Sequence, residues 1–318
     1  MDAVAAMQET AIQTILFPST SFQHWSATAA LTIVQAIGAF APLLEPKREE
    51  ITKARKTFKY GATDRHHLDV YYPSKTGQKH PILFYVYGGG FVQGARTLPP
   101  PADLGYGNVG LYFATRGFVT IIADYRLAPQ TTYPGPAEDL RDALSWAVAH
   151  PEELGPDADT ASVFLMGHSA GGVHILTLLL APSILTPELR AHLKGAILAS
   201  AACHYEPAGA QPDNREGLIM YYGSLEASAQ QSPLALLQAL SKDSVTALPP
   251  LAMIICERDP EWFKIVGSDF RTALAEKGRV APLIAAEGHN HISFSWALGT
   301  GQGEKWAEDI VAWIEGKL

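Results

Sequence analysis

The most regular feature of this sequence is a series of short apolar runs separated by polar or glycine-rich segments. Runs of about four to eight apolar residues, rich in β-branched and aromatic side chains, are typical of strands buried on both faces of a parallel sheet. One early run alternates instead, with Leu68, Val70 and Tyr72 on one face. The predicted strands cover residues 57–60, 67–72, 81–87, 119–123, 164–166, 195–200, 251–256 and 280–286.

Apolar residues recur at helical spacing in several segments between these runs. Residues 136–150 and 306–318 carry apolar side chains on one helical face, and residues 173–180 are almost entirely apolar. Strands that alternate with helices predict an α/β architecture with a mostly parallel central sheet flanked by helices. A chain of 318 residues can enclose one such domain with a large core, so we expect a single domain over residues 1–318.

Composition narrows the function classes. Hydrophobic residues make up 47% of the chain and charged residues 18%, and the net charge is −8. A net negative chain with one short cationic cluster, at residues 53–56, is not expected to bind nucleic acid. The two cysteines, Cys203 and Cys256, predict no disulfide framework. The sequence has neither the ligand spacing of a zinc site nor a phosphate-binding loop motif, so we expect no metal and no cofactor.

The N-terminal segment does not resemble a targeting sequence. A secretory signal begins with cationic side chains, whereas residues 1–4 carry none, so a cytoplasmic location is expected. The apolar stretch 27–44 contains Thr28, Gln35 and Pro42, which makes it marginal in length and polarity for a bilayer span. We expect an amphipathic or buried helix there and no membrane span.

The clearest chemical motif is Gly-His-Ser-Ala-Gly at residues 167–171, after a predicted strand and before an apolar helix. This is the context of a nucleophile elbow, in which a serine occupies a strained turn at the top of a sheet. Gly167 and Gly171 must be small because the strand and helix backbones approach closely there. The motif predicts Ser169 as a nucleophile; the alternative is a glycine-rich turn with an idle serine.

A glycine cluster, Gly88-Gly89-Gly90, follows the predicted strand over residues 81–87. Without side chains in the way, the backbone N–H groups of these residues can face a bound oxyanion. Lipases and esterases have such a loop, in which His usually precedes the glycines, whereas here the residue is Tyr87. The donors are main-chain groups, so this substitution need not abolish an oxyanion hole. The alternative is a tight exit from the strand.

Three sequence blocks and their spacing resemble the hormone-sensitive-lipase-like branch of the α/β-hydrolases, which holds many carboxylesterases. The blocks are residues 87–91, 124–129 and 167–172. The resemblance extends from about residue 56 to the C-terminus. It implies the α/β-hydrolase fold with a helical cap, and an oxyanion hole formed by the N–H groups of Gly88, Gly89 and Ala170.

The resemblance also orders the remaining catalytic groups as serine, acid and histidine along the chain. The acid of the family comes just after the strand predicted at residues 251–256, commonly as Asp-Pro, which implies Asp259. Glu257 is the rival because it lies closer to the strand end. Either carboxylate could instead be a solvated loop charge.

Two histidines compete for the role of general base on the loop after residues 280–286. The family pattern Gly-x-x-His aligns Gly288 with His291, which implies His291 as the base. His289 would then line the loop or bind its backbone. The other histidines lack such a context.

Two segments are expected to form the cap. In the family, N-terminal helices often cover the active site, which implies this role for residues 1–50. Residues 201–249 interrupt two predicted strands and are the second cap segment; their aromatic side chains could line a substrate pocket or pack internally. The N-terminal segment could instead pack on the body or in a homodimer interface, and the sequence leaves this open.

The predicted function is that of a serine hydrolase of the carboxylesterase type, acting on a small-molecule ester. Ser169, His291 and Asp259 would form the triad and pass through an acyl-enzyme without a cofactor. The alternatives are an amidase, formamidase, thioesterase or acyl transferase on the same fold, and a ligand-binding receptor without catalysis.

Overall fold

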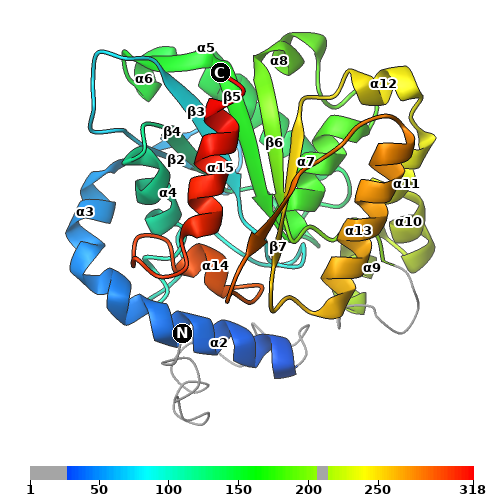
Figure 1. The fold of residues 1–318 in the computed structure, drawn as a ribbon, viewed down its shortest axis with the longest axis horizontal. Coiled ribbons are helices and arrows are strands. Elements are labelled where there is room, and N and C mark those ends of the chain that lie inside the picture. The colour runs from blue at the N-terminus through cyan, green and yellow to red at the C-terminus, as the bar shows by residue number, and fades with distance from the viewer. Residues whose placement is uncertain (1–26, 206–213) are drawn as a thin grey trace.

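The computed structural model describes residues 27–205 and 214–318, and its centre is an eight-stranded sheet with the order β1-β2-β4-β3-β5-β6-β7-β8 (Figure 1). The two pairings that involve β2 are antiparallel, and all others are parallel. The strands are β1 (Arg55–Lys59), β2 (His67–Tyr71), β3 (His80–Val86), β4 (Val119–Ala123), β5 (Ala158–His168), β6 (Leu193–Ala199), β7 (Leu251–Cys256) and β8 (Leu283–Ala286). The predicted α/β architecture with a mostly parallel sheet is therefore confirmed.

The hydrophobic pattern located the strands better than it located their ends. β4 and β7 coincide with the predicted runs, whereas β5 begins six residues before the predicted start at Phe164. The prediction of a strand from residue 280 was wrong, because β8 begins at Leu283. Pro282 lacks an N–H group and can only accept, from the Met253 N–H group at 2.9 Å, so the paired residues of β8 begin at Leu283.

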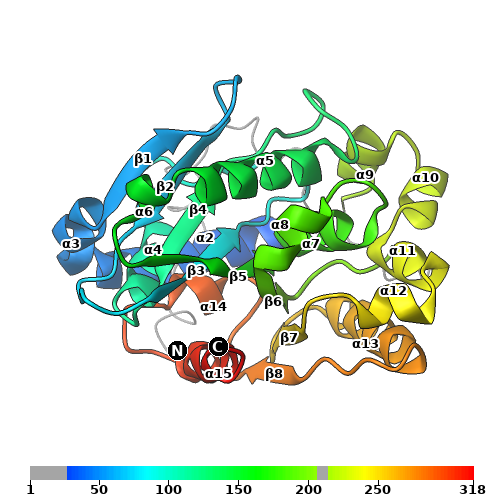
Figure 2. The ribbon, with the colours of Figure 1, turned by 90° about the horizontal axis from the view of Figure 1, so that it is seen from above.

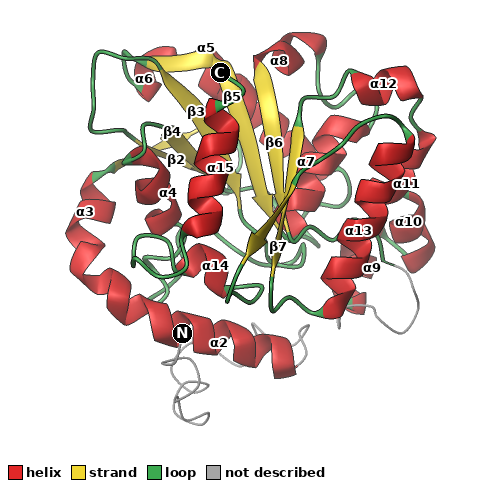
Figure 3. Ribbon diagram, in the orientation of Figure 1, coloured by secondary structure: helices red, strands yellow, loops and turns green. Residues whose placement is uncertain are grey.

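Helices cover both faces of the sheet (Figures 2 and 3). Among them, α5 and α7 lie on one side of the sheet and α15 lies on the other. The helices are α2 (Ala27–Leu44), α3 (Arg48–Lys53), α4 (Gly107–Ala114), α5 (Gly135–Ala149), α6 (Pro151–Leu154), α7 (Ala170–Leu180), α8 (Pro187–His192), α9 (Arg215–Tyr222), α10 (Leu225–Gln230), α11 (Pro233–Ala239), α12 (Lys242–Thr246), α13 (Glu261–Glu276), α14 (Ser293–Trp296) and α15 (Lys305–Glu315), with a 3₁₀ turn at Glu45–Lys47.

The segment between β6 and β7 folds into α9, α10, α11 and α12. Three of these helices begin at serine N-caps, Ser224, Ser232 and Ser241. Each serine hydroxyl accepts a hydrogen bond from the backbone N–H group three residues further along the chain. Serine N-caps satisfy backbone donors that the first helical turn leaves open, which lets short helices form. Of this segment, residues 206–213 lie outside the described part of the chain.

Two groups of buried side chains hold the layers together. The larger one fills the space between the sheet and its helices. The smaller one, here called the cap cluster, joins the loop after β3 and the start of α7 to α9 and α13. Its members are Phe91, Ala128, Ala170, Val173, Ala202, Tyr205, Leu218, Tyr221, Tyr222, Trp262 and Val266.

The N-terminal helix α2 was expected to be amphipathic or buried, and from Thr32 onward its side chains are mostly buried or half-buried. It packs against α14 (Figure 1). Residues 1–26 of the first predicted cap segment lie outside the described residues. Within the described ranges, none of the helices has the length and apolar character needed to span a bilayer.

Candidate active site

Loops from five parallel strands meet at one edge of the sheet. Gly88 follows β3, Ser169 follows β5, Ser200 follows β6, Asp259 follows β7 and His291 follows β8. These are all carboxyl ends of parallel strands, where ligands bind in open α/β sheets. The topology thus gathers the predicted site residues along one edge.

Ser169 occupies a strained turn between β5 and α7. Its φ of 52° and ψ of −122° lie outside the regions that L-residues favour. The turn is possible because Gly171 lacks a side chain: a Cβ there would lie 2.1 Å from the carbonyl oxygen of Val86. A Cβ at Gly167 would likewise lie 2.7 Å from the Gly171 backbone. This is the geometry that a nucleophile elbow requires.

The loop after β3 runs directly against this turn. A Cβ on Gly88 would lie 2.9 Å from Ser169 Cβ, and one on Gly89 would lie 1.9 Å from the Gln93 carbonyl oxygen, so neither position accepts a side chain. Within the described part of the chain, the N–H groups of Gly88, Gly89 and Ala170 donate no hydrogen bond to other protein groups. Among the described residues these three backbone donors are therefore unpaired; Gly88 lies against Ser169, and Ala170 follows Ser169 in the chain.

Tyr87, the residue in place of the usual His, is buried beneath this loop. Its hydroxyl donates to Asp124 Oδ1 at 2.7 Å and accepts from Arg65 Nη2 at 2.7 Å. Its ring stacks on Tyr125 and Tyr106, with centroid distances of 4.8 and 5.4 Å. Burial, and secondarily the Asp124 carboxylate, raises the pKa of Tyr87 well above its usual value, so the phenol stays protonated.

Asp259 and His291 form a buried pair. Nδ1 of His291 lies 2.8 Å from Asp259 Oδ1. The second oxygen, Oδ2, accepts hydrogen bonds from Ser200 Oγ at 2.5 Å and from the Cys256 N–H group at 2.8 Å. With both oxygens engaged, the carboxylate is fixed in orientation, and a donor Nδ1–H leaves Nε2 of His291 as the basic nitrogen.

The ring of His291 is also held by packing. The Phe263 ring stacks on it with a centroid distance of 4.1 Å, and the His168 ring lies 4.6 Å away. The loop that carries His291, residues 287–292, is here called the histidine loop. Because His168 immediately precedes Ser169, the second contact brings the histidine loop next to the turn at Ser169. Among the described residues, no hydrogen bond joins the Ser169 hydroxyl to His291; in unliganded sites such bonds are often long and tighten when substrate binds.

The two rival residues have other partners. Glu257 is exposed and accepts a hydrogen bond from the Gly288 N–H group at 2.5 Å. His289 is buried and bridges Gly303 O at 2.9 Å and Ser293 Oγ at 3.2 Å, so both of its ring nitrogens are occupied. Burial lowers the pKa of His289. Both residues tie the histidine loop to its surroundings.

Three contacts at the site had no signal in the sequence. Ser200 binds Asp259 although 59 residues separate them, and Asn214 Nδ2 donates to the Gly90 carbonyl oxygen at 2.9 Å across 124 residues. The third is the ring of Phe263 on His291. Ser200 has a φ of 45° directly after β6, but a strained serine after a strand cannot be recognised from letters alone.

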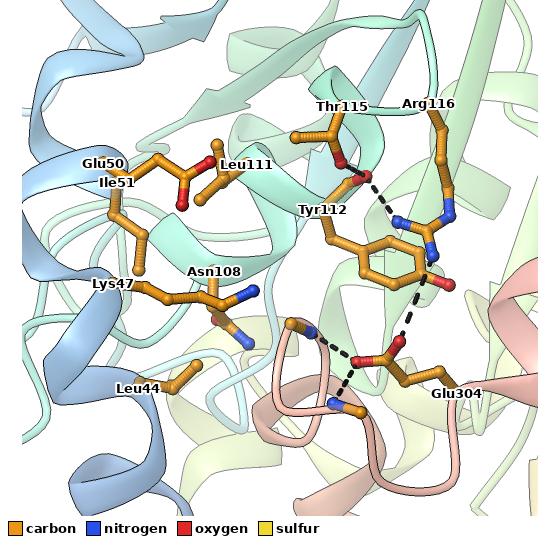
Figure 4. Close-up of a pocket in the computed structure, with 12 residues that line it drawn as sticks. Leu44, Lys47, Glu50, Ile51, Asn108, Leu111, Tyr112, Thr115, Arg116 and Glu304 are labelled. Carbon is orange, nitrogen blue, oxygen red and sulfur yellow. Dashed lines mark hydrogen bonds and ion pairs between the residues drawn. The ribbon is translucent and has the colours of Figure 1, made fainter.

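A separate cavity of about 240 Å³ lies between α3, α4 and the loop before α15 (Figure 4). Its wall is mixed in charge, with Lys47, Glu50, Arg116 and Glu304, and none of the predicted site residues lines it. Within the ranges 27–205 and 214–318, no group of three or more His, Cys, Asp or Glu side chains is arranged to hold a metal ion.

Parts of the chain are similar in sequence to known proteins. Residues 68–196 match the family model BD-FAE. The chain is 31% identical over 196 residues to versiconal hemiacetal acetate esterase of Dothistroma septosporum, covering 57% of each chain. It is 38% identical over 112 residues to probable carboxylesterase 7 of Arabidopsis thaliana, covering 33% of this chain and 35% of the relative. The matched part is thus about half of the first relative and a third of the second.

Solved structures of esterases share the architecture. Carboxyl esterase 2 of Tuber melanosporum superposes with a TM-score of 0.65 at 22% identity, covering 83% of this chain and 87% of that one. An esterase of Thermogutta terrifontis with bound propionate gives a TM-score of 0.62 at 23% identity, covering 83% and 94%. At these identities the likeness establishes the fold, and the eight-stranded sheet agrees with it.

Proposed function

We propose that this chain, an α/β-hydrolase of the hormone-sensitive-lipase-like branch, hydrolyses carboxylic esters through a Ser169–His291–Asp259 triad and an acyl-enzyme. The names of the relatives support an ester as the substrate class. The observation that carries the proposal is the buried Asp259–His291 pair, 2.8 Å apart, whose imidazole adjoins the strained Ser169 turn through His168.

In the proposed mechanism, Nε2 of His291 takes the proton of Ser169 as Oγ attacks the ester carbonyl carbon. The negative charge that develops on the carbonyl oxygen is stabilised by the N–H groups of Gly88, Gly89 and Ala170, which have no other partner in the described chain. The charge that develops on His291 is stabilised by the Asp259 carboxylate, which Ser200 and the Cys256 N–H group hold in orientation.

The second half of the reaction reuses the same groups. His291 gives its proton to the leaving oxygen of the ester as its bond to the carbonyl carbon breaks. The alcohol departs, and Ser169 keeps the acyl group. A water molecule then loses a proton to His291 and attacks the acyl carbon. His291 returns this proton to Ser169 Oγ as the bond between Oγ and the acyl carbon breaks, which restores the serine and releases the carboxylic acid. Tyr87 acts only through the backbone, because its hydroxyl is committed to Asp124 and Arg65.

We also propose that residues 1–50 and 201–249 cover the site as a cap. The cap cluster supports this for the second segment, because the rings of Tyr205, Tyr221 and Tyr222 pack against Phe91, next to the glycine loop. The stacked rings of Phe91 and Tyr221, 4.5 Å apart, would form an apolar wall near the nucleophile.

The test combines a covalent label with turnover. A fluorophosphonate should modify Ser169, located by peptide mass spectrometry, and the protein should hydrolyse p-nitrophenyl acetate. Ser169→Ala should lose both signals, whereas Ser241→Ala, which alters a serine N-cap away from the sheet edge, should keep both. Labelling of Ser169 without ester turnover would favour an amide or thioester substrate. Absence of both in the folded wild type would contradict a serine hydrolase.

A further inference from the structure

His168, the residue between Gly167 and Ser169, has a buried ring that contacts the histidine loop. Its centroid lies 4.6 Å from that of His291, with an angle of 48° between the planes, and 4.8 Å from that of Phe294. The residue is only 4% exposed. Neither of its ring nitrogens has a hydrogen-bond partner among the described residues, so the ring acts on its neighbours by packing.

The same ring also lies against the glycine loop. A Cβ on Gly88 would be 3.4 Å from His168 Nδ1, 3.0 Å from the His168 carbonyl oxygen and 2.9 Å from Ser169 Cβ. His168 is therefore in contact with three parts of the site at once: it is bonded to the nucleophile, it packs on the base, and it adjoins an oxyanion donor. The mechanism above assigns no role to this side chain.

The ring of His168 is kept uncharged. Burial, and secondarily the neighbouring His291, lowers the pKa of His168 well below its usual value. The titratable groups that face His291 are Asp259 from the loop after β7 and His168 from β5, while α13 presents the apolar Phe263. During turnover His291 becomes positive, and only a neutral neighbour at this distance leaves the Asp259–imidazolium pair undisturbed.

We propose that His168 is a positioning residue for the proposed ester hydrolysis, on which this inference rests: its neutral side chain packs against His291 and Gly88 together and holds the base in line with Ser169. The role is one of shape. A side chain of similar size without charge should replace it, and a small one should not.

The test compares His168→Ala and His168→Leu with His174→Ala as the matched control. His174 lies one turn into α7 and is likewise buried and neutral, with a pKa lowered to about 3 by burial. Its ring contacts Tyr125, Phe91 and Tyr221, with Nδ1 3.3 Å from the Tyr221 hydroxyl, and among the described residues it makes no hydrogen bond or ring contact with the triad. On an activated ester, His168→Ala should lower kcat by about ten- to a hundredfold, as misplacement of a catalytic group does, with KM within about threefold. His168→Leu should recover kcat to within about threefold of wild type.

A spectroscopic readout separates positioning from loss of folded protein. The low-field proton resonance of the Asp259–His291 hydrogen bond should broaden or vanish in His168→Ala, and should persist in His168→Leu and in His174→Ala. If His168→Ala does not fold, the folded leucine variant decides, since loss of kcat and of the resonance together would overturn the proposal. Wild-type kcat in His168→Ala, or an equal loss in His174→Ala, would also overturn it.

These results are distinguishable from a failure of the proposed function. An inactive, unlabelled wild type would reject the hydrolase itself, whatever the variants do. An active wild type with an inactive Ser169→Ala, beside an unaffected His168→Ala, would reject only the positioning role.

Discussion

The two flanks of Ser169 are built on different principles. On one flank, the proposed reactive groups are the side chains of Asp259 and His291, which are 2.8 Å apart and buried. On the other, the proposed reactive groups are backbone N–H donors, and Tyr87, Asp124 and Arg65 form a hydrogen-bond network beneath the glycine loop. Substitutions on the first flank should therefore abolish most of the activity, whereas substitutions on the second should lower it to different degrees. A backbone donor remains after most changes in the side chains that support it.

The largest effect is expected at the shared nucleophile. Ser169→Ala should lower kcat by about a million-fold, as where a comparable triad was dissected, with the fold unchanged because the elbow glycines remain. The measurement is kcat on one activated ester, with circular dichroism as the control for folding. More than about a tenth of wild-type activity would lie far outside that range and would remove Ser169 from the mechanism.

The acid should come next. Asp259→Asn should lower kcat by about ten thousandfold, since the hydroxyl–imidazole pair survives but the imidazolium loses its counter-charge. Glu257→Gln is the matched control and should stay within about threefold, because it removes one charge from an exposed hydrogen bond to the Gly288 N–H group. A severe loss in Glu257→Gln beside an active Asp259→Asn would exchange the two assignments.

On the second flank, Tyr87→Phe should keep most of the activity. It removes two hydrogen bonds, one donated to Asp124 and one accepted from Arg65. Asp124 still binds the Arg96 N–H group and guanidinium, and Arg65 still donates to two backbone carbonyl oxygens, so the expected loss of stability is about 1–3 kcal/mol. Tyr87→Ala should cost about 3–5 kcal/mol because the stacked ring leaves a cavity. Urea unfolding and kcat measure the two effects.

A phenylalanine variant as inactive as Ser169→Ala would contradict the difference between the flanks. It would mean that the phenol hydroxyl takes part in catalysis, and that the glycine loop is not held by backbone and packing alone.

A further expected effect concerns the dependence of stability on pH and leaves turnover aside. Burial lowers the pKa of His168, His174 and His289 in the folded state, so the unfolded chain binds more protons below its ordinary histidine pKa of 6.5. Stability is thus fully present above about pH 6.5 and falls as the pH drops, by about 1.4 kcal/mol per pH unit for each histidine. Urea unfolding of wild type and His174→Leu should show a shallower fall in the variant, and equal slopes would contradict it.

The sequence predicted the parts of the molecule that depend on local pattern. β4 and β7 coincide with apolar runs, and Gly167 and Gly171 fall where the elbow needs close backbone approach. It could not predict contacts between distant segments. The hydrogen bonds from Ser200 to Asp259 and from Asn214 to Gly90 form only when the strand order places these loops side by side. The spacing of residues in the sequence does not predict such contacts.

The choice between His291 and His289 tests the account most directly, because two residues on one loop cannot both reach the serine and the acid. The measurement is kcat of His291→Ala and His289→Ala on the same activated ester, each shown to be folded by circular dichroism. We expect His291→Ala to be nearly as inactive as Ser169→Ala. We expect His289→Ala, which loses only its bridges to Gly303 and Ser293, to lose little activity. A folded, inactive His289→Ala beside an active His291→Ala would contradict the proposed triad.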